Sequence, residues 1–179
     1  SMVVACMASV PVAAHFVFVV PERSTNRALT VLSETPQPDP EVDVAMIAGT
    51  ELSFRDLRGK ETPVTSSRRD NAFTLDLPKG RRGVVHGMTD LGVTDREGGI
   101  PHVLLYYPKA IIGDPFDSRT QLGARVPIEI VPVGSARSYR LRLLVRGTPV
   151  PQGEMTVIGP DGSEGTIGTN TEGLTGEFS

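Results

Sequence analysis

Short apolar runs broken by turn-forming residues are the feature that most limits what this chain can fold into. The 179 residues include 19 glycines and 15 prolines, and the apolar positions do not follow the 3.6-residue period of long amphipathic helices. In "AFTLDL" at 72–77, Phe73, Leu75 and Leu77 alternate with polar residues and would share one face of an extended chain. Repeated along the chain, this pattern predicts an all-β fold of antiparallel strands.

Eight apolar segments are expected to form strands, with one short helix among them. The stretch 40–49 predicts the helix, because Pro stands at an early position and Gly follows its end. The polar, basic residues 66–69 are expected at the tip of a hairpin. The expected strands are 15–20, 28–32, 51–57, 72–77, 83–88, 126–133, 138–147 and 154–162.

The irregular segment "GDPFDSRTQLG" at 113–123 predicts a linker between two antiparallel, β-sandwich-like modules. The expected division is a signal-peptide remnant at 1–14, an N-terminal β-module at 15–113, the linker at 114–122 and a second β-module at 123–179. An immunoglobulin-type sandwich takes about 100 residues. The second module is therefore expected to be truncated or unusually small.

A segment of small and apolar residues, "VVACMASVPVAA" at 3–14, precedes the first expected strand. It is shorter than the ~20 residues that cross a bilayer but has the length of the hydrophobic region of a secretory signal. Cleavage after Ala14 would make His15 the first residue of an exported periplasmic or extracellular protein. A cut one residue earlier would put His15 second, and a cut after Val12 would leave Ala-Ala-His. Lipidation of Cys6 and a plain apolar strand are the alternatives.

A terminal His15 would chelate a metal through its α-amine and imidazole, and Ala-Ala-His would form a square-planar Cu(II) or Ni(II) site. His102 and His86 are the expected partner ligands, on strands that meet around the "TDREGG" turn, with Asp90 or Asp95 as supporting carboxylates. In the alternative interpretation, His86 and His102 are packed and hydrogen-bonded within the fold. The hypothesis is a Ni²⁺ or Cu²⁺ site at His15, His102 and His86.

Composition argues against several other classes of function. The net charge is −3 and acidic and basic residues are interleaved, so the chain offers no basic stripe for nucleic acid and is expected to be peripheral to a membrane at most. The single cysteine cannot form an internal disulfide. No HExxH, CxxC, GxSxG or phosphate-binding loop is present. The chain is therefore expected not to be an enzyme, with a copper-dependent oxidative enzyme as the minor alternative.

Three stretches carry a resemblance: "AAHFVFVVPE" at 13–22, "GVVHGMTDLGVTDREGGIPHVLLYYPKA" at 83–110 and "VRGTPVPQGEMTVIGPDGSEGTIGTNTEG" at 145–173. Together they resemble a family of exported bacterial proteins that carries a domain of unknown function and is often described as a periplasmic component of nickel or cobalt uptake. The last stretch is also similar to carboxypeptidase-regulatory or transthyretin-like β-modules. Its turn reads "TNTEG", with Asn170 where those modules usually have an acidic residue.

Two functions follow as expectations. The first is an exported protein that binds Ni or Cu for uptake, delivery or buffering. The second is a non-catalytic structural or recognition β-module of the cell envelope that binds a protein or carbohydrate partner through its loops. The resemblance to metal-uptake proteins favours the first, and the transthyretin-like module favours the second.

Overall fold

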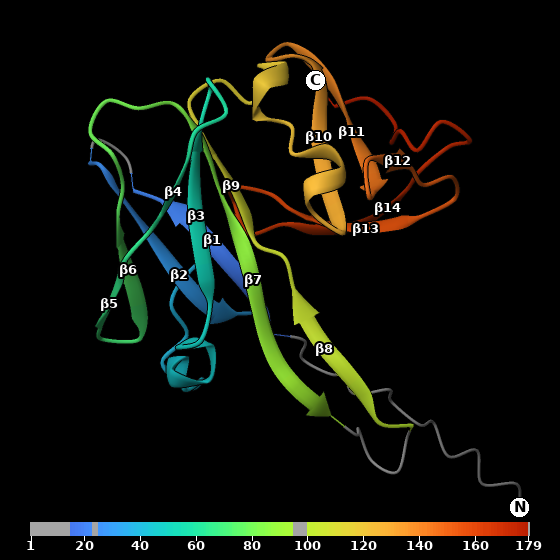
Figure 1. The fold of residues 1–179 in the computed structure, drawn as a ribbon. Helices are drawn as coiled ribbons and strands as arrows, with labels where there is room; N and C mark the ends of the chain where they lie inside the picture. Colours follow the sequence, from blue (N-terminus) through green and yellow to red (C-terminus); the bar gives the residue numbers. More distant parts are fainter. Residues whose placement is uncertain (1–14, 23–24, 95–99, 179) are drawn as a thin grey trace, which may run out of the picture.

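The computed structural model describes residues 15–22, 25–94 and 100–178, and within them the chain is almost entirely β-structure (Figure 1). Strands account for 52% of these residues and helices for 6%, which confirms the all-β class. No helix in the described ranges has the length and apolar character needed to span a membrane. The helices are three short 3-10 turns, η1 (Val44–Ile47), η2 (Ser118–Thr120) and η3 (Gly123–Arg125).

The first sheet has four antiparallel strands in the order β1-β2-β6-β5. Its strands form where apolar residues alternate with polar ones, as in β6, or where a long apolar run is buried, as in β2. The strands are β1 (Phe16–Pro21), β2 (Arg27–Ser33), β5 (Ser66–Arg69) and β6 (Ala72–Asp76).

The second sheet runs in the order β4-β3-β7-β8, and β9 also pairs with β7. β7 is the longest described strand; its first half pairs with β3 and β9, and its second half pairs with β8 on both sides of a bulge between Asp90 and Val93. Gly92 lies in this bulge with φ 77°, a conformation that glycine adopts without strain. The strands are β3 (Glu51–Asp56), β4 (Glu61–Pro63), β7 (Gly83–Thr94), β8 (His102–Tyr106) and β9 (Lys109–Ile112).

The two sheets pack face to face and share one core. The alternation predicted for β6 is confirmed in part: Leu75 is fully buried and the neighbouring Asp76 is exposed, but Thr74, expected on the polar face, is buried as well. Burying a Leu or Phe side chain stabilises a fold by about 1.5–3 kcal/mol, so this shared cluster holds the sheets together. Its buried members come from both sheets: Val19, Ala28, Leu75 and Leu77 from the first sheet or its edge, and Leu52, Phe54, Val85 and Ala110 from the second.

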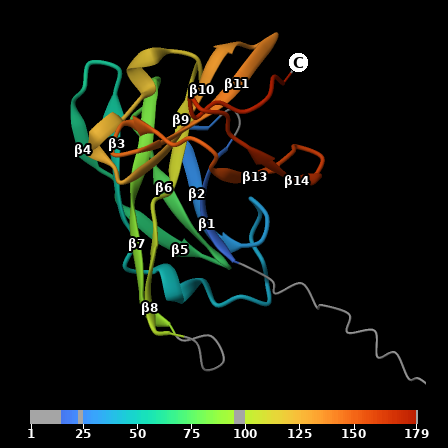
Figure 2. The ribbon, with the colours of Figure 1, turned by 90° about the vertical axis from the view of Figure 1, so that its right-hand side faces the viewer.

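The second half of the chain forms a three-stranded sheet, β10-β11-β12, and a separate hairpin of β13 and β14 (Figure 2). The stretch that follows β14 returns to β11, where the backbones of Phe178 and Tyr139 exchange two hydrogen bonds. The strands are β10 (Ile128–Ser135), β11 (Ser138–Val145), β12 (Thr148–Pro149), β13 (Glu154–Ile158) and β14 (Glu164–Gly168).

One local expectation is confirmed in a shorter form, and another is wrong. The stretch 40–49 forms a helix of only four residues, the 3-10 helix η1, which Asp43 caps by accepting a hydrogen bond from the backbone N–H of Ala45. The basic residues 66–69 are not a hairpin tip but the edge strand β5, and the turn follows at Asp70 and Asn71. An edge strand exposed on both faces has no apolar alternation to mark it, which is why the pattern did not reveal β5.

Candidate functional site

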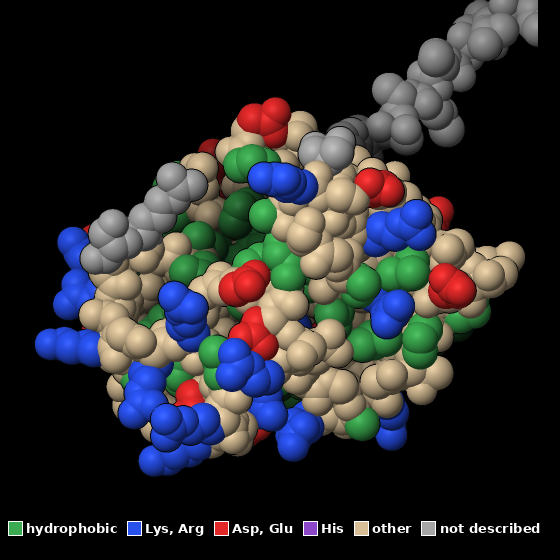
Figure 3. Space-filling model, turned by 90° about the horizontal axis from the view of Figure 1, so that it is seen from above, with side chains coloured by type: hydrophobic (Ala, Val, Ile, Leu, Met, Phe, Trp, Pro, Cys, Tyr) green, Lys and Arg blue, Asp and Glu red, His purple; other side chains and the backbone are tan. Residues whose placement is uncertain are grey.

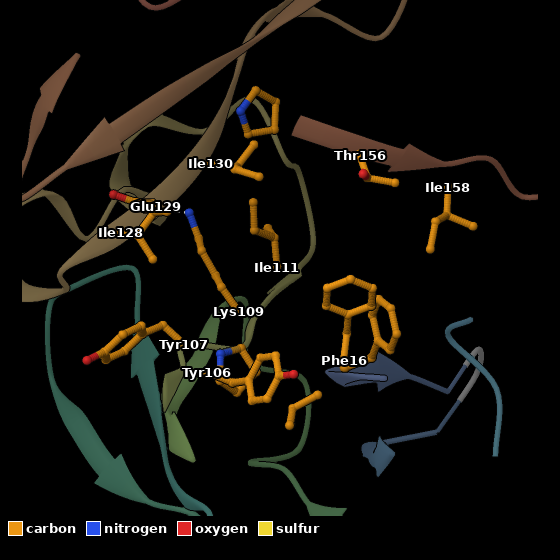
Figure 4. Close-up of a pocket in the computed structure, with 14 residues that line it drawn as sticks. Phe16, Tyr106, Tyr107, Lys109, Ile111, Ile128, Glu129, Ile130, Thr156 and Ile158 are labelled. Carbon is orange, nitrogen blue, oxygen red and sulfur yellow. Dashed lines mark hydrogen bonds and ion pairs between the residues drawn. The ribbon is translucent and has the colours of Figure 1, made fainter. Parts of the chain in front are cut away.

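An apolar groove lies where the first half of the chain meets the second. Its volume is about 540 Å³, and the labelled side chains of Phe16, Ile130 and Ile158 point toward a shared space in Figure 4. Three of the lining side chains are unusually exposed for their type: Phe16 at 39%, Ile128 at 45% and Ile130 at 42%. The groove is lined by Phe16, Val17, Phe18, Tyr106, Tyr107, Pro108, Lys109, Ile111, Ile128, Glu129, Ile130, Pro132, Thr156 and Ile158.

Aromatic side chains form one wall of the groove. The rings of Phe16 and Tyr106 meet edge to face with their centroids 6.4 Å apart, and Phe16 also contacts Phe18 at 6.2 Å. The Tyr106 hydroxyl donates a hydrogen bond of 2.6 Å to the backbone carbonyl of His15. This contact fixes the start of β1 against the end of β8, so the aromatic wall is held from two elements.

The only charged side chains in the lining belong to Lys109 and Glu129, and they neutralise each other. Lys109 Nζ lies 2.5 Å from Glu129 Oε1, and the two side chains are 13% and 1% exposed. The pair connects β9 to β10. As a result, the groove presents almost no net charge to a ligand.

Glu129 also anchors the segment that joins the two halves. Its Oε1 accepts a hydrogen bond from the backbone N–H of Leu122, and its Oε2 accepts one from Gly123. Leu122 and Val126 pack in turn on Val84 of β7. A buried carboxylate must be paired and hydrogen-bonded to be tolerated, and Glu129 has three such partners.

His86 lies close to this pair, on the neighbouring strand. Its cross-strand neighbours are Ser53 and Lys109, and its Nε2 lies 3.7 Å from Glu61 Oε1 without forming a hydrogen bond. Burial lowers the pKa of His86 below its ordinary value of 6.5, and the Glu61 carboxylate opposes that shift. A second hollow of about 560 Å³, lined by both polar and apolar residues, opens beside His86.

Acidification is expected to destabilise the fold between pH 6.5 and the lower pKa that His86 has in the folded chain. In that window the unfolded chain binds a proton that the folded chain does not, so stability present above pH 6.5 is lost as the pH falls. Urea unfolding between about pH 7 and about pH 5 measures the slope. His86→Gln should flatten it, and His102→Gln, which alters an exposed histidine, is the matched control. An unchanged slope in His86→Gln would contradict the prediction.

The structure does not bring the three histidines together. β7 and β8 pair as expected, but the register sets His102 opposite Thr94, whereas His86 lies opposite Lys109. The eight steps along β7 from His86 to Thr94 span roughly 25 Å at ~3.3 Å per residue. The expectation that strand pairing would bring His86 and His102 within ligand reach is therefore wrong.

His15 lies directly before β1, and its Nε2 is 3.9 Å from Asp39 Oδ2. The expected signal-peptide remnant at 1–14, which includes Cys6, lies outside the described residues, and so does Asp95, one of the expected supporting carboxylates. Within the ranges that are described, no three His, Cys, Asp or Glu side chains are grouped so that they could hold a metal ion. A site that uses the α-amine of a cleaved chain stays a prediction.

Sequence reasoning missed the residues that form the groove. Alternation in "VPIEIVPV" orients Ile128 and Ile130 the same way and Glu129 the opposite way, and an apolar pair would ordinarily face the core. The structure reverses this expectation, because Glu129 is 3% exposed while Ile128 and Ile130 are 45% and 42% exposed. The sequence signal that could have revealed the groove was the carboxylate of Glu129 between apolar residues of a predicted strand.

On the face shown in Figure 3, Lys and Arg side chains gather toward the lower left, while acidic, basic and hydrophobic side chains are mixed over the rest. No protein-family model, curated protein or solved structure matches this chain.

Proposed function

We propose that this chain is an exported, non-catalytic recognition protein that binds a protein partner in the groove between its two halves. The observation that carries the proposal is a groove of about 540 Å³ lined by exposed aromatic and aliphatic side chains, whose two charged residues, Lys109 and Glu129, pair with each other. Binding sites concentrate between structural units and are mostly apolar with few polar groups. Export is supported by the apolar segment at 3–14 and by the resemblance to exported proteins.

The chemistry of the lining favours a protein over a carbohydrate. Ile111, Ile128, Ile130 and Ile158 offer methyl groups, which suit the apolar side chains of a strand or loop. A carbohydrate would need many donors and acceptors for its hydroxyl groups, and burying those groups unpaired is costly. A charged ligand would gain little, because Lys109 and Glu129 already satisfy each other.

A short blocked peptide of alternating Val and Thr around one Trp is a suitable probe. The chain contains no tryptophan, so the fluorescence of the peptide reports binding without background. Its emission should shift to the blue and saturate as protein is added. Ile130→Glu places a charge in the apolar groove and should weaken binding at least about tenfold, a loss of ~1.4 kcal/mol.

Met46→Glu is the control, because Met46 is 61% exposed in η1, none of whose residues lines the groove. Equal binding by wild type and Ile130→Glu would contradict the groove as the site. Calorimetric titration of the same chain with Ni(II) and Cu(II) tests the metal-binding alternative. The recognition function would be wrong if the chain bound one of these metal ions at submicromolar concentration, lost that binding in His15→Ala, and did not bind the peptide. Metal uptake, delivery or buffering would then be the function.

A further inference from the structure

The second half of β7 and the whole of β8 form a hairpin arm, residues 88–94 and 100–106, that extends away from the rest of the molecule (Figures 1 and 2). Its exposed side chains are unusually apolar. Ten large hydrophobic side chains are exposed among the described residues, and half of them lie on the arm. These are Met88 at 38%, Val93 at 71%, Ile100 at 88%, Val103 at 58% and Leu105 at 37%.

The two faces of the arm have different environments. Val93 pairs with Val103 and Asp90 with Leu105, and cross-strand partners lie on the same face of a sheet, so these side chains form the outer face. On the other face, Leu91 and Tyr106 pack against the buried cluster that includes Val17, Leu32, Val44 and Ile47. The outer face is therefore exposed mainly at Val93 and Val103, at 71% and 58%, and is partly covered at Leu105.

β8 is also an edge strand without the usual protection. Its five residues, "HVLLY", contain no proline, lysine or carboxylate, and β7 is the only described strand that pairs with it. Natural proteins protect sheet edges with charges, prolines or short strands. Two other edges follow that rule: β5 carries Arg68 and Arg69, and the three-residue β4 contains Glu61 and Pro63.

The charge of the arm indicates the kind of partner. Asp90 is the only acidic or basic residue, histidine apart, among the described residues of the arm. In a two-fold symmetric interface each surface meets its own copy, so any charge near the axis would face a like charge. A nearly uncharged, apolar strand is complementary to itself. We propose that β8 pairs antiparallel with β8 of a second copy of this chain. The second sheet of each copy would then continue into that of the other across a two-fold axis.

This pairing is expected to be weak and to depend on concentration. A five-residue strand is about 17 Å long, which sets the interface at the low end of the size range for protein complexes. Sedimentation velocity of the full chain should show a monomer at low concentration and a dimer as the concentration rises. β8 shares only Tyr106 with the lining of the groove, so variants at Val103 and at Ile130 test the dimer and the proposed function separately.

Val103→Lys adds an edge charge of the kind that natural proteins use against strand pairing. It should raise the dissociation constant of the dimer at least about tenfold, with circular dichroism and thermal unfolding like wild type. Leu105→Lys is a second variant at the same edge. Val145→Lys, at an exposed valine of β11, is the control and should leave the dimer unchanged.

Disulfide trapping tests the contact directly. In a Cys6→Ser background, Val103→Cys should form a covalent dimer on mild oxidation, and Val145→Cys should not. A chain that remains monomeric up to about millimolar concentration would overturn the proposal. So would a dimer that Val103→Lys leaves intact, or one that Ile130→Glu abolishes, because the latter would move the interface to the groove.

Discussion

Replacing Glu129 by alanine is expected to lower the free energy of unfolding by about 3–5 kcal/mol, the usual effect of breaking a buried ion pair. Lys109 would keep a largely buried ammonium group without its carboxylate partner. The backbone N–H groups of Leu122 and Gly123 would lose their acceptor at the same time. Urea denaturation at neutral pH measures the change.

Two variants separate the charge of Glu129 from its hydrogen bonds. Glu129→Gln keeps one acceptor oxygen but removes the charge. Its free energy of unfolding should therefore lie between that of wild type and that of Glu129→Ala. Glu164→Ala alters an exposed glutamate of β14 and should change stability by less than about 0.5 kcal/mol. A loss below about 1 kcal/mol in Glu129→Ala would contradict the buried role of the pair.

Gly87→Ala is expected to lower the free energy of unfolding by about 3 kcal/mol or more, at the upper end of the range for overpacking. A Cβ atom at Gly87 would lie 1.9 Å from the backbone oxygen of Glu51 and 2.9 Å from Cδ2 of Leu52. The backbone oxygen cannot rotate aside as a side chain can. Pairing between β3 and β7 would therefore have to open beside His86.

Gly165→Ala is the control for this variant. Gly165 also lies in a strand, but a Cβ there would meet no heavy atom within 4 Å. The change in stability should stay within about 1 kcal/mol. Thermal unfolding compares the two variants, and equal midpoints would contradict the close approach of β3 and β7 at Gly87.

Much of the strand pattern could be predicted from the sequence, because local rules govern it. Leu75 is buried, as the alternation in 72–77 predicts. The "GPDG" signal marks the turn between β13 and β14, where Gly162 has φ 82°. In "TNTEG", the Asn170 side chain accepts hydrogen bonds from the backbone N–H groups of Glu172 and Leu174, as expected for an asparagine at a turn.

Other elements could not be predicted, because their neighbours define them. β9 is a four-residue strand that forms by pairing with β7, and β5 is an exposed edge without apolar alternation. The separation of His86 from His102 depends on which residues of β7 and β8 face each other. Local sequence constrains the register of two paired strands only weakly when the turn between them is long.

Alternation and turn chemistry act over a few neighbouring residues, so the all-β class, the main strands and their turns follow from the sequence alone. The burial of Glu129 between Ile128 and Ile130, which line the groove, depends instead on distant parts of the chain. The N–H groups of the joining segment and the ammonium group of Lys109 converge on one point and require a carboxylate there. That convergence brings together residues from three separate stretches of chain, which no local pattern encodes.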